Sequence, residues 1–261
     1  MGRGGHAELS PQNSEPMLAL DIGNSSVKAA VWRDGWGPVA RFPCDDADVA
    51  RWARRLAEVG PADRAALASV VPRLTPVLVA ALTEVASRAP FVVTADAALP
   101  FRLAYETPHT LGADRLAAAV AAHTLANGRA VIAVDAGSTV TTEVVSAEPA
   151  YLGGAIVPGP DLLLRSLTRD TEQLPDVPWP DTLAPVGAST LAAIQSGVGG
   201  LLADGVAGLV ERTRQALGGD ALVVATGGWA EWLAAHTDVI DRVVPTLVLD
   251  GVRQLADGQD G

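Results

Sequence analysis

A carboxylate and a guanidinium stand side by side in residues 111–115 (Leu-Gly-Ala-Asp-Arg), directly before the apolar run 116–120. The run is rich in helix formers, so the pair is expected at a helix start, where free backbone N–H groups favour anions. Asp114 could there take a proton from a substrate hydroxyl, and the planar fork of Arg115 suits a carboxylate. The alternative is a first-turn Asp paired with a surface Arg, and sequence position alone favours that alternative.

A second chemical feature occurs twice. Residues 20–25 (Leu-Asp-Ile-Gly-Asn-Ser) and 134–139 (Val-Asp-Ala-Gly-Ser-Thr) each end an apolar strand with Asp, any residue, Gly and a hydroxyl, and each precedes another β-prone run. A single such motif usually marks a plain turn, but paired glycine-rich hairpins can clamp a polyphosphate and its Mg²⁺. The repeat therefore favours phosphate binding between two similar, facing domains. Lys28 could reach a phosphate, and a solvated strand lysine is an equal alternative.

The elements that position these residues alternate between strands and helices. In the first half we expect a hairpin at 17–33, a loop and amphipathic helix at 41–59, a strand at 65–71, a helix at 74–87 and a short strand at 91–94. The helix opened by residues 111–115 should end at Asn127-Gly128. This alternation predicts an α/β layer sandwich with a mixed sheet.

In the second half the pattern begins again with a strand at 130–135 and its hairpin partner at 140–146. We expect a strand running into a Gly/Pro turn at 151–160, a helix at 161–171, a proline-rich surface loop at 174–185 and a long helix at 188–217. The glycines of 153–159 either admit a ligand or only relieve crowding. The small residues of the long helix suit a dimer seam, although a core helix is the safer interpretation. A strand at 221–225, the segment 226–228 (Thr-Gly-Gly) and a helix at 229–235 form another place where a nucleotide could lie.

Composition excludes several classes of protein. The 261 residues are 49% hydrophobic, which suits two domains, and their net charge of −11 with Lys28 as the only lysine argues against nucleic-acid or anionic-membrane partners. Cys44 is the only cysteine, so neither an intrachain disulfide nor a thiolate zinc cluster is expected, and a reducing cytoplasm fits. Residues 1–16 are expected to be a disordered extension rather than a signal sequence. No apolar stretch is expected to reach the length of a membrane span. The histidines lack the spacing of a transition-metal site. No Walker loop and no nucleophile elbow occurs, which excludes P-loop kinases and α/β-hydrolases.

Six segments in order resemble the motifs of type III pantothenate kinases: 21–25, 68–72, 111–115, 135–138 with Thr141, 153–159 and 226–228. Any one motif is loose, but the ordered set is specific, and the resemblance covers residues 17–255. That family belongs to the actin/Hsp70/sugar-kinase superfamily of duplicated ribonuclease-H-like domains, in agreement with the internal repeat. The resemblance implies an α/β fold of two such domains, residues 17–127 and 128–261, with mixed central sheets flanked by helices.

The same resemblance implies roles for individual residues. Asp114 matches the proton acceptor, Asp135 the ligand of a monovalent cation, and Asp21 a residue that helps to hold Mg²⁺ through the phosphates. Thr190 matches a threonine that reaches the substrate bound in the partner subunit. The implied ATP-binding residues are Asp21, Ile22, Gly23, Asn24, Ser25, Ser26, Val27, Lys28 and Ser138. The implied pantothenate-binding residues are Tyr105, Gly112, Ala113, Asp114, Arg115 and Thr190.

This chain departs mildly from the family pattern. Serine replaces the usual threonine at positions 25 and 138, Thr139 replaces an alanine, and residues 106–108 (Glu-Thr-Pro) replace a more common Asn-Pro. Hydroxyl groups are retained at both turns, so these changes bear on affinity more than on activity.

The function implied is the ATP-dependent phosphorylation of pantothenate to 4'-phosphopantothenate, the first step of coenzyme A synthesis. ATP, Mg²⁺ and K⁺ or NH4⁺ would be required, and the active unit would be a cytoplasmic homodimer without nucleic-acid or membrane partners. One alternative is a non-catalytic regulatory protein of the same fold, against which the intact Asp21, Asp114, Arg115 and Asp135 argue. Another is a kinase of the superfamily for a different hydroxyl acceptor, such as a sugar.

Overall fold

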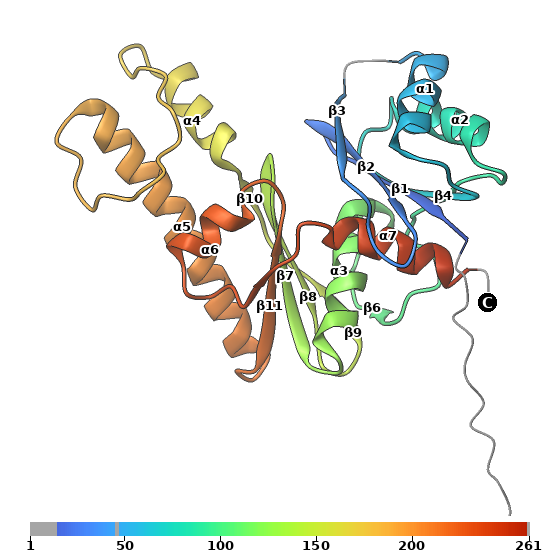
Figure 1. The fold of residues 1–261 in the computed structure, drawn as a ribbon. Helices are drawn as coiled ribbons and strands as arrows, with labels where there is room; N and C mark the ends of the chain where they lie inside the picture. Colours follow the sequence, from blue (N-terminus) through green and yellow to red (C-terminus); the bar gives the residue numbers. More distant parts are fainter. Residues whose placement is uncertain (1–14, 45–46, 260–261) are drawn as a thin grey trace, which may run out of the picture.

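The computed structural model of the chain describes residues 15–44 and 47–259, and its elements form two mixed sheets with helices on their faces (Figure 1). The first sheet has the strand order β3-β2-β1-β4-β5. Its strands are β1 (Met17–Ile22), β2 (Ser26–Trp32), β3 (Ala40–Pro43), β4 (Arg64–Ser69) and β5 (Phe91–Val92), and its outer helices are α1 (Val49–Val59) and α2 (Thr75–Val85).

The second sheet has the order β12-β11-β7-β8-β9-β6, with β10 paired to β8. Its strands are β6 (Arg102–Leu103), β7 (Ala130–Ala136), β8 (Thr139–Val145), β9 (Ala150–Gly153), β10 (Ile156–Pro158), β11 (Ala221–Thr226) and β12 (Arg242–Val243). The associated helices are η1 (Pro108–Thr110), α3 (Ala113–Ala126), α4 (Pro160–Arg169), α5 (Thr190–Ala216), α6 (Ala230–His236) and α7 (Leu247–Asp257).

The centres of the two sheets repeat one arrangement. In the first, β1 pairs antiparallel with β2 and parallel with β4. In the second, β7 pairs antiparallel with β8 and parallel with β11. Both Asp-x-Gly motifs therefore lie in the turns of antiparallel hairpins, as the sequence predicted, and the mixed, duplicated sheets flanked by helices confirm the predicted fold class.

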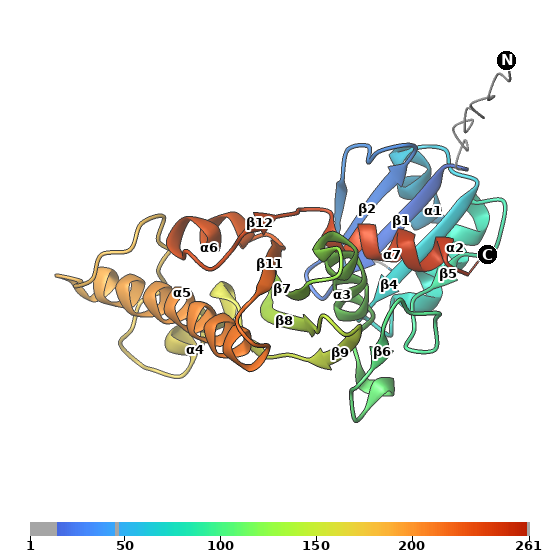
Figure 2. The same ribbon diagram turned by 90° about the horizontal axis from the view of Figure 1, so that it is seen from below.

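Both faces of the central strands are buried, which explains their continuous apolar sequences. Along β1, Met17 and Ala19 face the core that contains α3 and α7, whereas Leu18, Leu20 and Ile22 face the core beneath α1 and α2. A third core lies between the second sheet and helices α5 and α6. Helices α3 and α7 lie side by side between the two sheets (Figure 2).

Helix α7 was not predicted from the sequence. It follows the second sheet in the chain, yet it contacts β1 and β4 of the first sheet. Its close approach to α3 needs Gly251, because a Cβ there would lie 1.8 Å from the carbonyl oxygen of Ala117. In the other direction β6, which precedes residue 128, pairs with β9. The predicted domain division at 127/128 stays a prediction. The contacts of α7 with β1 and β4, and the pairing of β6 with β9, both cross this boundary.

Several predicted elements differ in detail from those observed. β3 occupies part of the loop expected from residue 41, because β2 offers it a free edge for pairing. The single strand expected from residue 151 is divided into β9 and β10. Of the extension predicted for residues 1–16, residues 1–14 lie outside the described chain. The carbonyl oxygen of Pro16 accepts hydrogen bonds from the N–H groups of Asp63 and Arg64, so Pro16 belongs to the fold.

Within the described residues, α5 is a helix long and apolar enough to cross a membrane by length and composition alone, with a mean hydropathy of 1.3 over its most apolar window. The expectation that no segment reaches this length was therefore wrong. One side of α5 packs on the second sheet through Leu202, Val206 and Val210. Core packing accounts for much of its apolar character, while Leu201 on another side is 64% exposed.

Candidate active site

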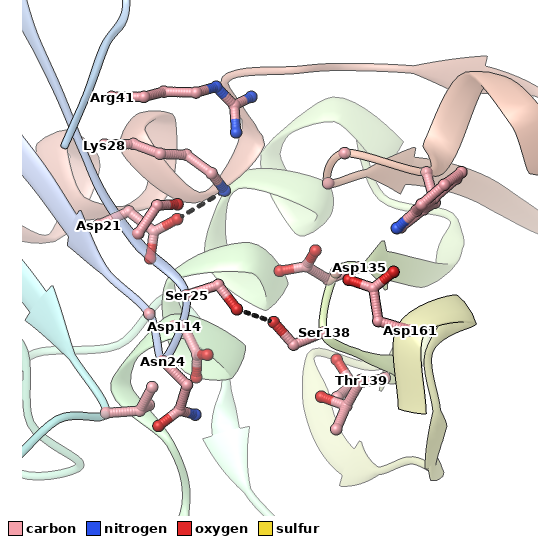
Figure 3. Close-up of a pocket in the computed structure, with 18 residues that line it drawn as sticks. Asp21, Asn24, Ser25, Lys28, Arg41, Asp114, Asp135, Ser138, Thr139 and Asp161 are labelled. Carbon is pink, nitrogen blue, oxygen red and sulfur yellow. Dashed lines mark hydrogen bonds and ion pairs between the residues drawn. The ribbon is translucent and has the colours of Figure 1, made fainter. Parts of the chain in front are cut away.

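The two hairpin turns meet across a cleft between the sheets. The hydroxyl oxygens of Ser25 and Ser138, which come from the two turns, lie 2.6 Å apart. Figure 3 shows the side chains of Asp21, Asp114 and Asp135 around the same space. The cleft is lined by Asp21, Gly23, Asn24, Ser25, Ser26, Lys28, Arg41, Val70, Asp114, Asp135, Gly137, Ser138, Thr139, Thr141, Asp161, Gly227, Gly228 and Trp229.

In the first hairpin a carboxylate and an amine neutralise each other. Asp21 is the cross-strand partner of Lys28 in the β1–β2 register, and the Lys28 Nζ donates to Asp21 Oδ2 over 2.9 Å. Burial would lower the pKa of Lys28, but the charges of Asp21 and Asp135 together raise it. Lys28 is therefore a paired cation that lines the cleft and not a solvated strand lysine, while its contact with a phosphate stays a prediction.

In the second hairpin the carboxylate has no such partner. The cross-strand partner of Asp135 is Thr141. Burial deep in the cleft raises the pKa of Asp135 to about 7, with the charges of Asp21, Asp114 and Glu143 acting in the same direction and that of Lys28 opposing. Gly227 brings the start of α6 against this carboxylate, since a Cβ there would lie 2.5 Å from Asp135 Oδ1. Among the described residues, none forms an ion pair with the carboxylate of Asp135 like that between Lys28 and Asp21.

Asp114 lies in the first turn of α3, which begins at Ala113, as the sequence predicted. Its Oδ1 accepts a hydrogen bond of 2.7 Å from the backbone N–H of Arg115. Burial, followed by the charge of Asp21, raises the pKa of Asp114, while the N–H and the charge of Arg115 oppose this rise. A carboxylate with a raised pKa is a stronger proton acceptor, so the position suits general base catalysis.

Arg115 is not a surface residue, because its side chain is only 11% exposed. Its Nε donates to Glu143 Oε1 over 2.7 Å, and the Tyr151 hydroxyl donates to Glu143 Oε2 over 2.5 Å. Burial alone would lower the pKa of Arg115, but the hydrogen bond and charge of Glu143 raise it. The alternative of an exposed ion pair between Asp114 and a surface Arg is therefore excluded.

The predicted site residues divide into three groups. Those that line the cleft are Asp21, Gly23, Asn24, Ser25, Ser26, Lys28, Asp114, Asp135 and Ser138. Ile22 and Val27 have fully buried side chains in the core beneath α1 and α2, so only their backbone can face a ligand. Tyr105, Gly112, Ala113, Arg115 and Thr190 do not line this cleft. Thr190, at the start of α5, is exposed.

Sequence reasoning missed several lining residues. Arg41 lies on β3, which was expected to be a loop, and Asp161 lies in the first turn of α4. Gly228 belongs to the segment 226–228 that the sequence did single out, and Trp229 follows that segment directly. A Gly pair between a strand and a helix was therefore the available signal for this side of the cleft. Glu143 was also missed.

The donor set of the cleft fits a polyphosphate that brings its own Mg²⁺. Hydroxyls from both hairpins, Lys28 and Arg41 offer hydrogen bonds and positive charge to phosphate oxygens. Among the described residues no group of three or more His, Cys, Asp or Glu is placed to hold a metal by itself. A divalent cation in this cleft would therefore need phosphate oxygens as well as protein carboxylates.

Solved structures define the class of protein. The fold is similar to a protein from Campylobacter jejuni described as a Baf family transcriptional activator, with a TM-score of 0.63 and 19% identity over 93% of this chain and 98% of that one. It is also similar to MreB 5 of Spiroplasma citri bound to AMPPNP, with a TM-score of 0.51 and 11% identity over 95% and 97% of the two chains. The chain thus has the fold of the actin-like ATPases and sugar kinases.

Sequence relatives define the family within this class. The family model of type III pantothenate kinase matches residues 17–238. A type III pantothenate kinase of Moorella thermoacetica is 32% identical over 91% of this chain and 97% of its own length. One from Symbiobacterium thermophilum is 36% identical over 91% and 94%. The chain belongs to the type III pantothenate kinase family.

Proposed function

We propose that this protein transfers the γ-phosphoryl group of ATP to the primary hydroxyl of pantothenate, giving 4'-phosphopantothenate and ADP, the first step of coenzyme A synthesis. The observation that carries the proposal is the position of Asp114, whose carboxylate shares one cleft with both phosphate-type hairpins in a member of this family. Its raised pKa suits the proton acceptor of such a reaction.

The triphosphate lies between the hairpins, where Lys28 and the hydroxyls of Ser25 and Ser138 meet its oxygens. Asp114 accepts the proton of the pantothenate hydroxyl as that oxygen bonds to the γ-phosphorus and the bond from phosphorus to the ADP oxygen breaks. Asp21 would help to hold Mg²⁺, which offsets phosphate charge when bound. The transition state is loose, so positioning and electrostatics by these residues provide most of the rate.

Asp135 holds a monovalent cation, K⁺ or NH4⁺, beside the phosphates. Two observations support this assignment: Asp135 faces Thr141 where Asp21 faces Lys28, and its pKa is raised to about 7. An ionised carboxylate in this environment needs a positive charge, and the chain does not place one against it as it does for Asp21.

The active unit is a homodimer in the cytoplasm. Leu191 and Leu201 of α5 are exposed, and a Cβ added at Gly197, Gly200 or Gly205 would meet no atom within 4 Å, so parts of this helix are free to contact another chain. Thr190, at the start of α5, is exposed and lies outside its own cleft. Both facts support the role implied by the family resemblance, in which Thr190 completes the pantothenate site of the partner.

The reaction is tested by ADP release on a panel of hydroxyl acceptors, namely pantothenate, glucose, N-acetylmannosamine and glycerol, with Asp114→Asn as the inactive control. Pantothenate is expected to be the preferred acceptor, with a product heavier by one phosphoryl group. Preference for a sugar would replace the proposed substrate. The absence of turnover on every acceptor would favour a regulatory protein of this fold.

The shared site is tested separately by co-expression of Thr190→Val and Asp114→Asn chains. In a mixed dimer both mutations fall in the same composite site, so the other site, with Asp114 from one chain and Thr190 from its partner, should be sound. A monomer with full activity, or a mixed pair no better than its parents, would contradict the dimer model and leave Thr190 as a helix-start residue.

A further inference from the structure

Glu143 is fully buried, and the proposed phosphoryl transfer gives this carboxylate no role. Within the described chain, Asp21 and Glu143 are the buried acids, and Glu143 has no exposed surface. Burial raises the pKa of Glu143, because a charged carboxylate is less stable in the protein interior than in water. A buried ion pair is weak evidence for a stabilising role, because apolar side chains of similar volume serve stability equally well. The position of this carboxylate therefore calls for another explanation.

Both oxygens of Glu143 accept hydrogen bonds, one from a residue implied in pantothenate binding and one from a buried tyrosine. Oε1 accepts from the Nε of Arg115 over 2.7 Å, and Oε2 accepts from the Tyr151 hydroxyl over 2.5 Å. The Nε–H is one of five donors in the guanidinium fork. A contact through Nε fixes the plane of the group and leaves the terminal nitrogens for other partners.

The same network reaches Tyr105, the aromatic residue that the family resemblance implies in pantothenate binding. Tyr105 shares a hydrogen bond with Arg115, and its ring lies edge-on to that of Tyr151 with centroids 5.7 Å apart. Gly153 permits this packing, since a Cβ there would lie 3.3 Å from the Tyr105 ring. The second sheet thus supports both Arg115 and Tyr105, through Glu143 on β8 and Tyr151 on β9.

Arg115 also links this network to the base. Its backbone N–H donates to Asp114 Oδ1, while its side chain bonds to Glu143. Arg115 thus contacts the proton acceptor through its backbone and Glu143 through its side chain. A rotation of the guanidinium would change the directions of its terminal N–H groups without moving the N–H that holds Asp114.

We propose that Glu143 is a positioning residue: it holds the guanidinium of Arg115 so that the terminal N–H groups face the carboxylate of pantothenate. This inference rests on the proposed function. Because Glu143 also offsets the charge of Arg115, the site recognises a carboxylate by directed hydrogen bonds rather than by net positive charge. Glu143 thereby sets the preference for carboxylate-bearing acceptors over neutral ones.

The test compares pantothenate with pantothenyl alcohol, in which a hydroxymethyl group replaces the carboxylate, in the wild type and in Glu143→Gln. We expect the KM for pantothenate to rise about tenfold, with kcat and the KM for ATP changed less than about twofold. The kcat/KM for the alcohol, or its inhibition constant where it is not turned over, should be unaltered. The preference for the acid therefore falls about tenfold.

Equal losses on both acceptors would overturn the proposal in favour of a purely structural role. A lower KM for pantothenate would also overturn it, because Glu143 would then only neutralise Arg115. If the wild type does not phosphorylate pantothenate, the proposed function fails. If it does so and Glu143→Gln keeps the wild-type preference, only the positioning role fails.

Tyr151→Phe is the matched variant, because it removes the hydrogen bond to Oε2 and keeps the contact between Glu143 and Arg115. It should shift the acceptor preference in the same direction by about two- to threefold. Circular dichroism shows whether each variant folds. If Glu143→Gln does not fold, Tyr151→Phe decides the matter, and an unchanged preference in that variant overturns the proposal.

Discussion

The two glycine-rich hairpins share a sequence pattern and a position at the centre of a sheet, yet they differ in charge. In the first, Asp21 faces Lys28, and their charged atoms are 2.9 Å apart. In the second, Asp135 faces Thr141, and burial raises the pKa of Asp135 to about 7. One hairpin carries its own cation and the other does not.

This difference shows how a duplicated element can take two roles in one cleft. The first hairpin can meet phosphate oxygens with a fixed positive charge. The second presents a carboxylate to the same space, where phosphates would repel it unless a cation lies between them.

Asp114→Asn should have the largest effect, because it removes the proposed base. This base lies on α3 and on neither hairpin. The substitution keeps the size of the side chain and removes the proton acceptor, so kcat should fall by about 10² to 10⁴ while ATP affinity changes little. Steady-state kinetics and nucleotide binding by calorimetry measure the two quantities. Near-normal kcat would remove Asp114 from the mechanism.

Lys28→Gln makes the first hairpin resemble the second. A charge-assisted contact is lost and Asp21 is left without its partner, so kcat/KM for ATP should fall by about 10- to 100-fold. Lys28→Arg, which keeps the charge, is the control and should retain more of the activity. Equal losses in the two variants would show that the shape of the lysine matters and its charge does not.

The potassium requirement should depend on pH through Asp135. With a pKa of about 7, roughly a tenth of Asp135 is ionised at pH 6 and roughly nine tenths at pH 8, so the potassium concentration for half-maximal rate should rise about tenfold on going from pH 8 to pH 6. The raised pKa also means that a stabilising contribution is lost as the pH rises through 7. Potassium should therefore raise the melting temperature more at pH 8 than at pH 6.

Asp135→Asn is the control for both measurements and should abolish the effect of potassium on the melting temperature at either pH. A potassium requirement that is the same at pH 6 and pH 8 would contradict the assignment of the cation to this carboxylate.

The smallest effect is expected at the contact between the hairpins. Ser25→Ala and Ser138→Ala each remove the same exposed hydrogen bond, so each should change the free energy of unfolding by less than about 1 kcal/mol and raise the KM for ATP by about two- to threefold. The double variant should cost no more stability than either single one, because one bond is shared. Additive losses of stability would show that the two hydroxyls act independently.

The sequence predicted those parts of the site that depend on local turn chemistry. Both Asp-x-Gly turns, the helix start at Asp114 and the Gly pair at 227–228 were recognised because glycine, hydroxyl and carboxylate residues act over a few positions of the chain. The duplicated sheets followed from the repeat of the first of these signals. Such features are visible without any knowledge of which strands pair.

Other features depend on contacts between distant segments and left no local signal. Glu143 lies within a run of buried residues of β8 and belongs to no local motif, and only the fold brings Arg115 to it. The contacts of helix α7 with β1 and β4 join opposite ends of the chain, so no local signal predicts them. Arg41 was missed because β3 is an edge strand whose formation depends on pairing with β2.

The most direct test of the difference between the hairpins is the initial rate of pantothenate-dependent ADP formation in potassium and in sodium buffers of equal ionic strength, at pH 8 and saturating ATP. Selectivity between these ions follows from the size of the cation site and the number of its ligands. We predict a rate at least about tenfold higher in potassium. Equal rates in the two buffers would contradict the account and leave Asp135 as a ligand of Mg²⁺ or a structural residue.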